Sequence, residues 1–403
     1  MSSSPSEPSA LSVEAAVEAA FAGERAQVLA TVIRLSGDWD LAEECVQEAF
    51  ERALRRWPDD GVPARPGAWL TVTARRVALD RLRRGVTEAQ KMRLLTSTTQ
   101  DAHHDDRLRL LFTCCHPALP FESRVALTLR TVAGLEVEQI AAAFLITPAT
   151  ATRRITRAKQ KIRNAGIPYR VPAPEMLHER LTGVLAVVYL IFNQGYSGHS
   201  GPELLAGEAI RLGRLLAHLM PTETEVRGLL ALMVLHQSRS AARHDAGGTL
   251  ITLDQQDRDR WDQELISEGL SLLSGTRTPY QLQAAIAACH ARAPRAPDTD
   301  WQRIVQLYAA LHQITRSPVV ELNRVVAVSM AHGPALALPL LDGLESDLGG
   351  YYLLPATRAD LLRRLDRRAE AAQHYRRALD LAPTPAEKAF LTGRLEESGI
   401  VGE

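Results

Sequence analysis

The stretch GLEVEQIAAAFLITPATATRRITRAKQKIR, residues 134–163, has the pattern of two short helices joined by a tight turn. Leu135, Ile140 and Ala143 mark a short first helix. The residues Phe144–Ile146 fit the turn. This pattern predicts a helix-turn-helix, a unit that can place its second helix in the major groove of DNA.

The second helix is predicted to begin after Thr147, whose hydroxyl can cap it, with Pro148 at the first position. One apolar stripe follows at helical spacing: Ala151, Ile155, Ala158 and Ile162. The other faces carry basic residues and no acid: Arg153, Arg154, Arg157, Lys159, Lys161 and Arg163. A solvated helix of an ordinary bundle is the alternative, but such a face normally interleaves Glu with Lys or Arg. The absence of acids therefore favours DNA binding.

The charges of the chain are separated along its length. The 403 residues hold 47 Lys and Arg and 47 Asp and Glu, so the net charge is zero. Residues 1–60 nevertheless sum to −7, whereas residues 65–93 hold eight bases against two acids and residues 153–170 hold seven bases and no acid. An acidic start and two basic patches suggest a protein partner together with nucleic acid.

Composition predicts an all-α fold. Aromatic residues make up 5% of the chain, and nearly every periodic segment has the helical period. Four cysteines give no disulfide framework. The longest apolar run, residues 184–192, is too short to span a bilayer, and MSSSPSEPSA at the start has no signal-peptide pattern. We therefore expect a cytoplasmic protein without a membrane segment.

The first module is predicted over residues 11–86. In DLAEECVQEAFERALRRW (40–57), Asp40 is the expected cap, and Glu44, Gln47, Glu48 and Glu51 lie off the apolar stripe. That stripe is Ala42, Val46, Ala49, Phe50, Ala53 and Trp57. A loop over 58–66 precedes a basic third helix over 67–84, whose Arg75, Arg76, Arg81, Arg83 and Arg84 are expected to face outward.

A polar linker, residues 87–105, separates this module from a second one over 106–168, which holds the helix-turn-helix. Prolines at 168, 172 and 174 mark the next boundary, and residues 174–403 read as an array of helical hairpins. Ala371, Tyr375 and Ala378 have the spacing of the second helix of a tetratricopeptide repeat. A weaker copy lies 34 residues earlier, at Ala335, Ala337 and Leu341.

The order of these motifs resembles bacterial RNA polymerase sigma factors of the extracytoplasmic-function group. Residues 40–57 are similar to the group's helix that docks on the polymerase clamp, PGAWLTVTARRVALDRLRR (66–84) to its −10-reading helix, and residues 134–163 to its −35-reading helix-turn-helix. The tail resembles that of a subgroup with a long, tetratricopeptide-like C-terminal extension. The matching stretches are LLFTCCHPAL (110–119), YLIFNQGYSG (189–198), LDQQDRDRW (253–261) and ELNRVVAV (321–328).

This resemblance implies an alternative sigma factor rather than an enzyme, with no cofactor and no metal. Its partners would be promoter DNA and core RNA polymerase, which it would contact at the clamp and the flap. The C-terminal domain would pack on the sigma domains of the same chain and regulate them in cis. No separate inhibitor is predictable. The implied polymerase contacts are Glu44, Gln47, Glu48 and Glu51. The implied −10 residues are Trp69, Arg75, Arg76, Asp80, Arg83 and Arg84. The implied −35 residues are Ala149, Thr150, Thr152, Arg153, Arg154, Arg157 and Lys161.

Three positions depart from the pattern of the group. Arg76 stands where the group usually has Asn, Leu145 where it has Gly in the turn, and Gln194 where Glu is frequent. We expect a slightly altered turn at Leu145, because a leucine there disfavours a positive φ. The presence of Gln194 weakens any proposal that this position needs a carboxylate.

Other interpretations account for less of the sequence. One alternative is a helix-turn-helix regulator with a sensing array that is not a polymerase subunit, but it leaves residues 40–57 and 66–84 unexplained. Another is a helical-repeat scaffold whose basic patches bind RNA. Equal affinity for unrelated nucleic acids, with no promoter dependence, would favour that scaffold. Cys114, Cys115 and His116 with His103 and His104 lack zinc-site spacing, so buried structural cysteines are expected. GYSGHSG (195–201) lacks the G-x-S-x-G form of a hydrolase. Trp69 can stack on a base, but its apolar stripe favours core packing.

Overall fold

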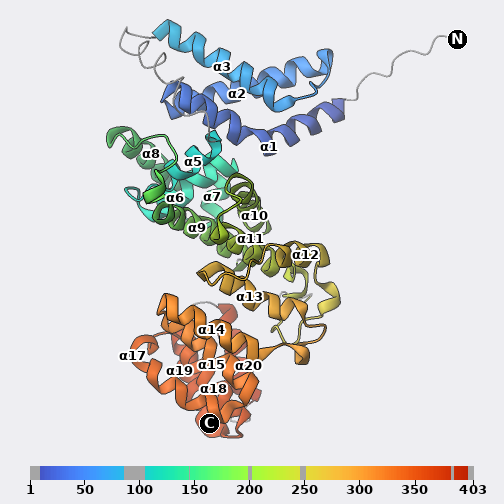
Figure 1. Cartoon of the computed structure of the whole chain (residues 1–403), viewed down its shortest axis with the longest axis vertical. Coiled ribbons are helices and arrows are strands. Elements are labelled where there is room, and N and C mark those ends of the chain that lie inside the picture. Colours follow the sequence, from blue (N-terminus) through green and yellow to red (C-terminus); the bar gives the residue numbers. More distant parts are fainter. Residues whose placement is uncertain are drawn as a thin grey trace, which may run out of the picture. The chain divides into compact units, whose positions relative to one another are not determined.

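The computed structural model describes residues 10–85, 105–144, 146–197, 202–245, 251–382 and 385–397. Within these ranges the chain forms helices and no strand, which confirms the all-α class (Figure 1). None of the described helices is long and apolar enough to cross a membrane. The chain divides into two compact units, Met1–Leu212 and Gly213–Glu403.

The first unit begins with a three-helix bundle of α1 (Ala10–Ser36), α2 (Trp39–Asp60) and α3 (Pro66–Gly85), drawn in blue in Figure 1. The predicted apolar stripe of α2 is buried along its whole length. Arg84 belongs to α3, but its side chain lies outside the described residues.

Both ends of α2 differ from the expectation. The cap is Asp38 rather than Asp40, because the Asp38 carboxylate accepts hydrogen bonds from the backbone N–H groups of Asp40 and Leu41, at 2.9 and 3.1 Å. Gly37 ends α1 with a φ of +67°, which a glycine adopts without strain. At its other end α2 continues through Pro58 to Asp60, although Pro58 has no N–H to donate to the carbonyl four residues earlier.

The helix-turn-helix lies within a second group of helices in this unit: α5 (Asp106–Cys114), α6 (Phe121–Thr128), η1 (Leu129–Ala133), α7 (Val137–Ala143) and α8 (Pro148–Asn164). Both α6 and α7 pack against α8. The predicted linker falls almost entirely on residues 86–104, which lie outside the described residues.

The recognition helix α8 has its predicted construction. Thr147 caps it through a hydrogen bond from Thr150 N, and Pro148 takes the first position. All four residues of its apolar stripe, Ala151, Ile155, Ala158 and Ile162, are buried. In the preceding helix α7, Ala141 is buried beside Ile140, whereas Ala143 is only half-buried. Leu145, where we expected an altered turn, lies outside the described residues.

Helices α9 (Pro174–Ser197) and α10 (Pro202–Leu219) follow the proline-rich boundary. Helix α9 packs on α5 and α6, and the break between the compact units falls inside α10, after Leu212. The first part of the sequence extension is therefore built onto the helix-turn-helix group.

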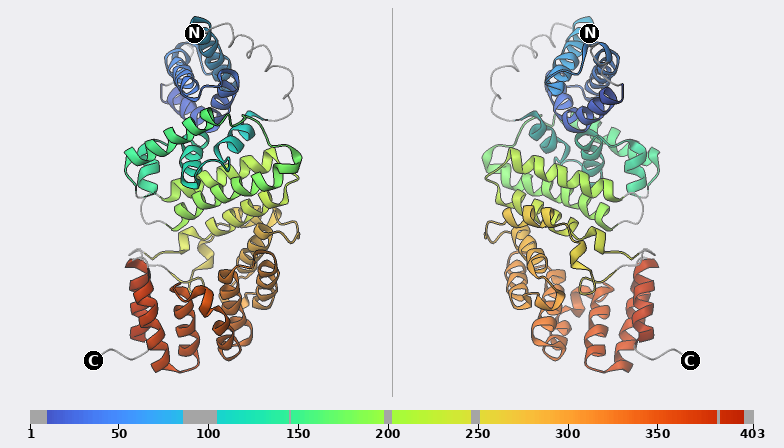
Figure 2. Two further views of the ribbon diagram at one scale, coloured as in Figure 1. Left: turned by 90° about the vertical axis from the view of Figure 1, so that its left-hand side faces the viewer. Right: turned by 90° about the vertical axis from the view of Figure 1, so that its right-hand side faces the viewer.

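The second unit consists of helices that pack mainly on their neighbours in the sequence, as expected for a hairpin array. Figure 2 shows its orange and red helices side by side. The longer ones are α11 (Thr224–Gln237), α12 (Gln263–Ser271), α13 (Pro279–Arg292), α14 (Trp301–Thr315), α15 (Pro318–His332), α18 (Leu353–Arg364), α19 (Arg368–Leu381) and α20 (Pro385–Glu397).

The two tetratricopeptide-like copies have different structures. Ala371, Tyr375 and Ala378 are buried in α19 between its neighbours, as their spacing predicts. The earlier copy does not form a second long helix: residues 334–348 are divided among α16 (Pro334–Ala337), η5 (Leu338–Leu344) and α17 (Glu345–Leu348). Ala337 and Leu341 are buried there, but Ala335 is exposed. Pro339 lacks the amide hydrogen that a continuous helix would use at this point.

Candidate nucleic-acid and polymerase interfaces

The basic face of α8 borders a concave surface in the first unit. A cavity of about 560 Å³ is lined by Thr150, Arg153, Arg154, Arg157 and Lys161 of α8 together with the start of α6. The first two turns of α8 also expose Ala149 and Thr152. All seven residues predicted for −35 recognition are thus wholly or partly accessible, whereas the apolar stripe of the same helix is buried.

Arg153 is tied to the start of α8. Its guanidinium donates to the Thr150 hydroxyl at 3.2 Å, and that hydroxyl is 2.9 Å from the hydroxyl of Thr147. The arginine is therefore directed toward the first turn, where a recognition helix meets base edges. Arg157 and Lys161 lie farther along the helix, where phosphate contacts are more common.

Helix α3 presents a second basic face. Arg75, Arg76, Asp80 and Arg83 are exposed. Arg81, which the sequence suggested would also face solvent, instead donates to two carboxylates of α2, those of Glu44 and Glu48, the latter at 2.8 Å. Arg81 therefore links α3 to α2.

Trp69 has a mixed environment. Its ring packs edge-on against the buried Trp57, with 5.6 Å between ring centroids, yet the residue is only half-buried. The expected core packing accounts for the contact with Trp57, and part of the residue remains accessible.

The predicted polymerase-binding residues form one polar surface on α2. Glu44 is more exposed than Glu48 or Glu51, with 66% of its side chain accessible. Glu48 is paired with Arg52 and Arg81. Gln47 donates to Glu51 at 3.2 Å, and Glu51 is 4.0 Å from Arg55.

An acidic groove adjoins this surface, and α1 supplies part of it. The groove has a volume of about 1,070 Å³ and an apolar floor that includes Phe21 and Phe50, whose rings are 5.2 Å apart. Its acids are Glu14, Glu18, Asp40, Glu43, Glu44, Glu51 and Glu136, against the bases Arg25 and Arg130. The contribution of Glu14 and Glu18 was missed, although two acids four residues apart with no neighbouring base are a recognisable signal.

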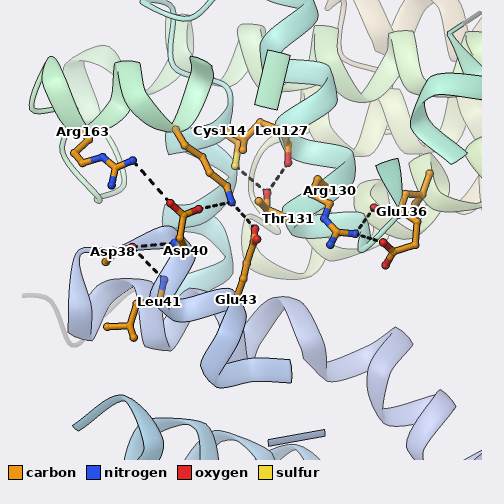
Figure 3. A network of polar contacts seen from close by, with 12 residues as sticks. Asp38, Asp40, Leu41, Glu43, Cys114, Leu127, Arg130, Thr131, Glu136 and Arg163 are labelled. Carbon is orange, nitrogen blue, oxygen red and sulfur yellow. Dashed lines mark hydrogen bonds and ion pairs between the residues drawn. The ribbon is translucent and has the colours of Figure 1, made fainter. Parts of the chain in front are cut away.

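Helix α8 is attached to α2 by an ionic contact that the sequence did not predict. Lys159 is 8% exposed, and its Nζ lies 3.0 Å from Asp40 Oδ1 and 2.9 Å from Glu43 Oε1. Arg163 approaches Asp40 at 3.9 Å. Figure 3 shows both carboxylates turned toward α8. Lys159 was predicted to be one of the solvent-facing bases, and that prediction is wrong because the α2 carboxylates bury it.

Further polar contacts join α1 to the helix-turn-helix group. Asp106 accepts from the Arg34 guanidinium and the Thr31 hydroxyl, and it also pairs with the buried Arg109 at 3.0 Å. The Tyr169 hydroxyl donates to the carbonyl of Ala30 at 3.0 Å. Burial, then the charge of Asp106, holds the pKa of Tyr169 well above its usual range, so the hydroxyl remains a donor. We call these contacts, with those of Lys159, the closed interface.

Side chains of α9 and α10 donate hydrogen bonds to backbone carbonyls of the helix-turn-helix group. Gln194 donates to Ala143 O at 2.8 Å, at the end of α7. Arg180 donates to Phe112 O at 2.8 Å, and Arg211 to Val132 O at 3.3 Å. The amide at position 194 therefore acts as a donor to a helix end, a role that the carboxylate of Glu could not perform when ionised.

The adjacent cysteines Cys114 and Cys115 are buried and contact threonine hydroxyls. Cys114 and Cys115 are buried, as expected, and their sulfurs lie 3.2 and 3.6 Å from the hydroxyls of Thr131 and Thr128. Burial raises the pKa of Cys115 to about 11, which disfavours the thiolate that a metal would need. Among the residues that the structure describes, no group of three potential ligands surrounds a metal position. His103, His104 and the end of GYSGHSG lie outside those residues.

Comparison with protein families identifies the two DNA-facing groups. Residues 21–87 match region 2 of sigma-70 factors, and residues 109–162 match region 4. A probable extracytoplasmic-function RNA polymerase sigma factor, SigI of Mycobacterium tuberculosis, is 29% identical over 163 residues, which are 38% of this chain and 56% of that protein. The chain belongs to the extracytoplasmic-function group of sigma factors. It is an alternative sigma factor, of a family that binds core RNA polymerase and promoter DNA to initiate transcription.

One relative of this sigma factor is similar over the extension as well. An uncharacterized protein of Rhizobium meliloti is 42% identical over 402 residues, covering 94% of this chain and 95% of the relative. Residues 180–277 match a family of unknown function. That match contains most of α9 and all of α10, the two helices that hold the carbonyls of region 4.

The closed interface leads to a prediction about the free sigma factor. Lys159→Met should separate α8 from α2, because it leaves two carboxylates facing an apolar side chain. We would measure the distance between spin labels at Arg55→Cys and Thr156→Cys, both exposed, in a protein with Cys289 replaced by Ser. We expect a narrow distance distribution in the parent and a broad one with Lys159→Met.

Lys161→Met is the matched control, because Lys161 is an exposed lysine of the same helix. It should leave the distribution narrow. An equally narrow distribution in the Lys159→Met protein would show that this lysine does not hold the two helices together.

Proposed function

We propose that this sigma factor binds the polymerase clamp through the acidic groove and the polar surface of α2. The groove carries seven acids against two bases, above an apolar floor. That combination suits a basic helical partner that also buries apolar side chains, because charge complementarity guides the encounter and apolar burial stabilises the complex. Glu44, Gln47, Glu48 and Glu51 would make the polar contacts.

Region 2 would read the −10 element through α3. The exposed Arg75, Arg76 and Arg83 are suited to phosphates, with Arg84 continuing the series, and the accessible part of Trp69 is suited to stacking on an unpaired base. Asp80 adds an acceptor to this face.

Region 4 would read the −35 element with the first two turns of α8, with Ala149, Thr150, Thr152 and Arg153 at base edges. Arg154, Arg157 and Lys161 would hold phosphates, and the polymerase flap would carry this region.

The observation that most strongly supports control in cis is the attachment of the extension to region 4. Three side chains of α9 and α10 donate to its backbone carbonyls, and region 4 in turn closes on region 2 through Lys159. We infer that α9 and α10 set the conformation of region 4. Its release from region 2 would then accompany polymerase binding, when the two regions engage clamp and flap.

Transcription in vitro tests the polymerase assignment. The full chain added to bacterial core polymerase should give start sites on a promoter library that core alone does not use. Glu51→Lys should reduce that output by weakening core binding about tenfold, or about 1.4 kcal/mol, because it reverses a charge in the acidic surface. The substitution breaks only the contacts with Gln47 and Arg55.

Glu175→Lys, an equal charge change at the exposed start of α9, is the control and should retain full output. Undiminished core affinity in the Glu51→Lys protein would remove this surface from the interface. If the full chain binds duplex promoter DNA strongly without polymerase, a regulator that is not a polymerase subunit would be favoured.

Substitutions in α8 separate base reading from phosphate contact. Arg153→Ala should relax the preference at one position of the −35 element by about 1–3 kcal/mol, because a bidentate arginine contact to guanine is lost. Arg157→Ala should instead weaken all sequences equally. Output from a single-base promoter library, measured with each holoenzyme, distinguishes the two. A uniform loss with Arg153→Ala would reassign this residue to phosphate.

Gln194→Ala tests control by the extension. The change removes the hydrogen bond to Ala143 O, worth about 1 kcal/mol, and should lower output from promoters that depend on the −35 element by about fivefold. Thr182→Ala, which removes an exposed side-chain bond within the same helix, should leave output unchanged. Equal output from the Gln194→Ala and parent proteins would argue against control through this contact.

A further inference from the structure

The second unit contains a groove lined by arginines that none of the sigma-factor contacts uses. Its volume is about 810 Å³, and its charged residues are Asp254, Arg258, Asp360, Arg363, Arg364 and Arg394. Four bases thus face two acids. The lining residues come from the segments around Arg258 and Pro297 and from α13, α14, α15, α18, α19 and α20, so elements far apart in the sequence form the groove together.

Two of the arginines direct their hydrogen bonds to neutral acceptors, although the charge of Asp298 also acts on Arg258. Arg364 is exposed and is held by α15, since its guanidinium donates to the hydroxyl and the carbonyl of the buried Ser329. Arg258 donates to the carbonyls of His290 and Ala293 and to the Thr299 hydroxyl. These acceptors are neutral, so both side chains are fixed in position while the groove remains positive.

The other two arginines have acidic neighbours. Arg363 pairs with Asp360 at 2.7 Å, and Arg394 pairs with Glu397 at 2.8 Å. His290 adds no charge at pH 7, because burial and the nearby Arg239 and Arg258 lower its pKa to about 4. The positive charges among the lining residues are therefore those of the four arginines, against the two acids Asp254 and Asp360.

Apolar side chains lie between these charges and are accessible. Val326 and Met330 of α15 are 38% and 42% exposed, and Phe390 of α20 is 41% exposed, with the Arg394 guanidinium 5.3 Å from its ring centroid. A small-molecule pocket normally encloses most of its ligand, whereas a groove with such exposed apolar walls suits an extended or helical peptide.

We propose that this groove binds an acidic peptide segment of a partner protein, with its carboxylates on the arginines and its apolar side chains on Val326, Met330 and Phe390. Charge complementarity argues for an acidic occupant, and the exposed apolar walls argue for a peptide. The groove lies entirely within the second unit, so this binding is separate from the polymerase and promoter contacts of the first.

The test uses the full chain and two pools of peptides of about 12 residues in random order. One pool combines Asp and Glu with Leu, Phe and Ser, and the other replaces every acid with its amide. The immobilised protein should retain the acidic pool, and a selected acidic peptide, labelled with fluorescein, should bind at least about tenfold more tightly than its amide counterpart. Equal retention of both pools would overturn the proposal.

Three variants locate the binding. Arg364→Ala should weaken the selected peptide about tenfold by removing an uncompensated charge, and Phe390→Ala should weaken it about fivefold by removing an apolar wall. Arg368→Ala removes an exposed arginine of α19 that pairs with Asp366 and does not line the groove, so binding should not change. Thermal unfolding of each variant confirms that the array remains folded.

Two results would contradict the assignment. Unchanged affinity of the Arg364→Ala and Phe390→Ala proteins would place the peptide elsewhere. Displacement of the peptide by inorganic phosphate at an equal concentration would identify a site for small anions. Neither result depends on transcription, so the sigma-factor assignment would be unaffected.

Discussion

The structure of the first unit depends on a buried ammonium group between two helices that have different tasks. Lys159 projects from the helix suited to DNA, and its two carboxylate partners project from the helix suited to polymerase. A lysine with this little exposure requires its partners, because an unpaired ammonium in the interior would cost several kcal/mol. The contact therefore links the positions of regions 2 and 4 in the free protein.

This link has a thermodynamic consequence for holoenzyme formation. If only the open form engages clamp and flap together, the closed interface lowers the apparent affinity for core polymerase by the fraction of molecules that are open. Each 1.4 kcal/mol in favour of closure corresponds to about tenfold in that affinity. Contacts remote from DNA, such as that of Gln194 with Ala143 O, can then alter transcription by changing this balance.

The sequence predicted the parts of the molecule that depend on local pattern. Thr147 and Pro148 identified the start of α8, and a helical stripe identified its buried side, because capping and periodicity are properties of neighbouring residues. Lys159 could not be distinguished from Lys161 in this way. Both are bases off the apolar stripe, and only the packing of α2 buries one of them. Arg81 was assigned to solvent for the same reason, although Glu44 and Glu48 hold it.

The boundary of the C-terminal extension likewise depends on packing that local sequence patterns do not reveal. Prolines at 168, 172 and 174 mark a change in the chain, but α9 packs back onto α5 and α6, so the compact unit continues to Leu212. Removing everything after Pro172 would delete α9 and uncover the parts of α5 and α6 on which it packs. The deleted residues include seven that are buried and apolar in the full chain: Leu181, Val184, Leu185, Val187, Val188, Ile191 and Phe192. Such a truncation would confuse loss of control with loss of folding. Single substitutions in the full chain avoid this, because each removes one contact and leaves the apolar face of α9 covered.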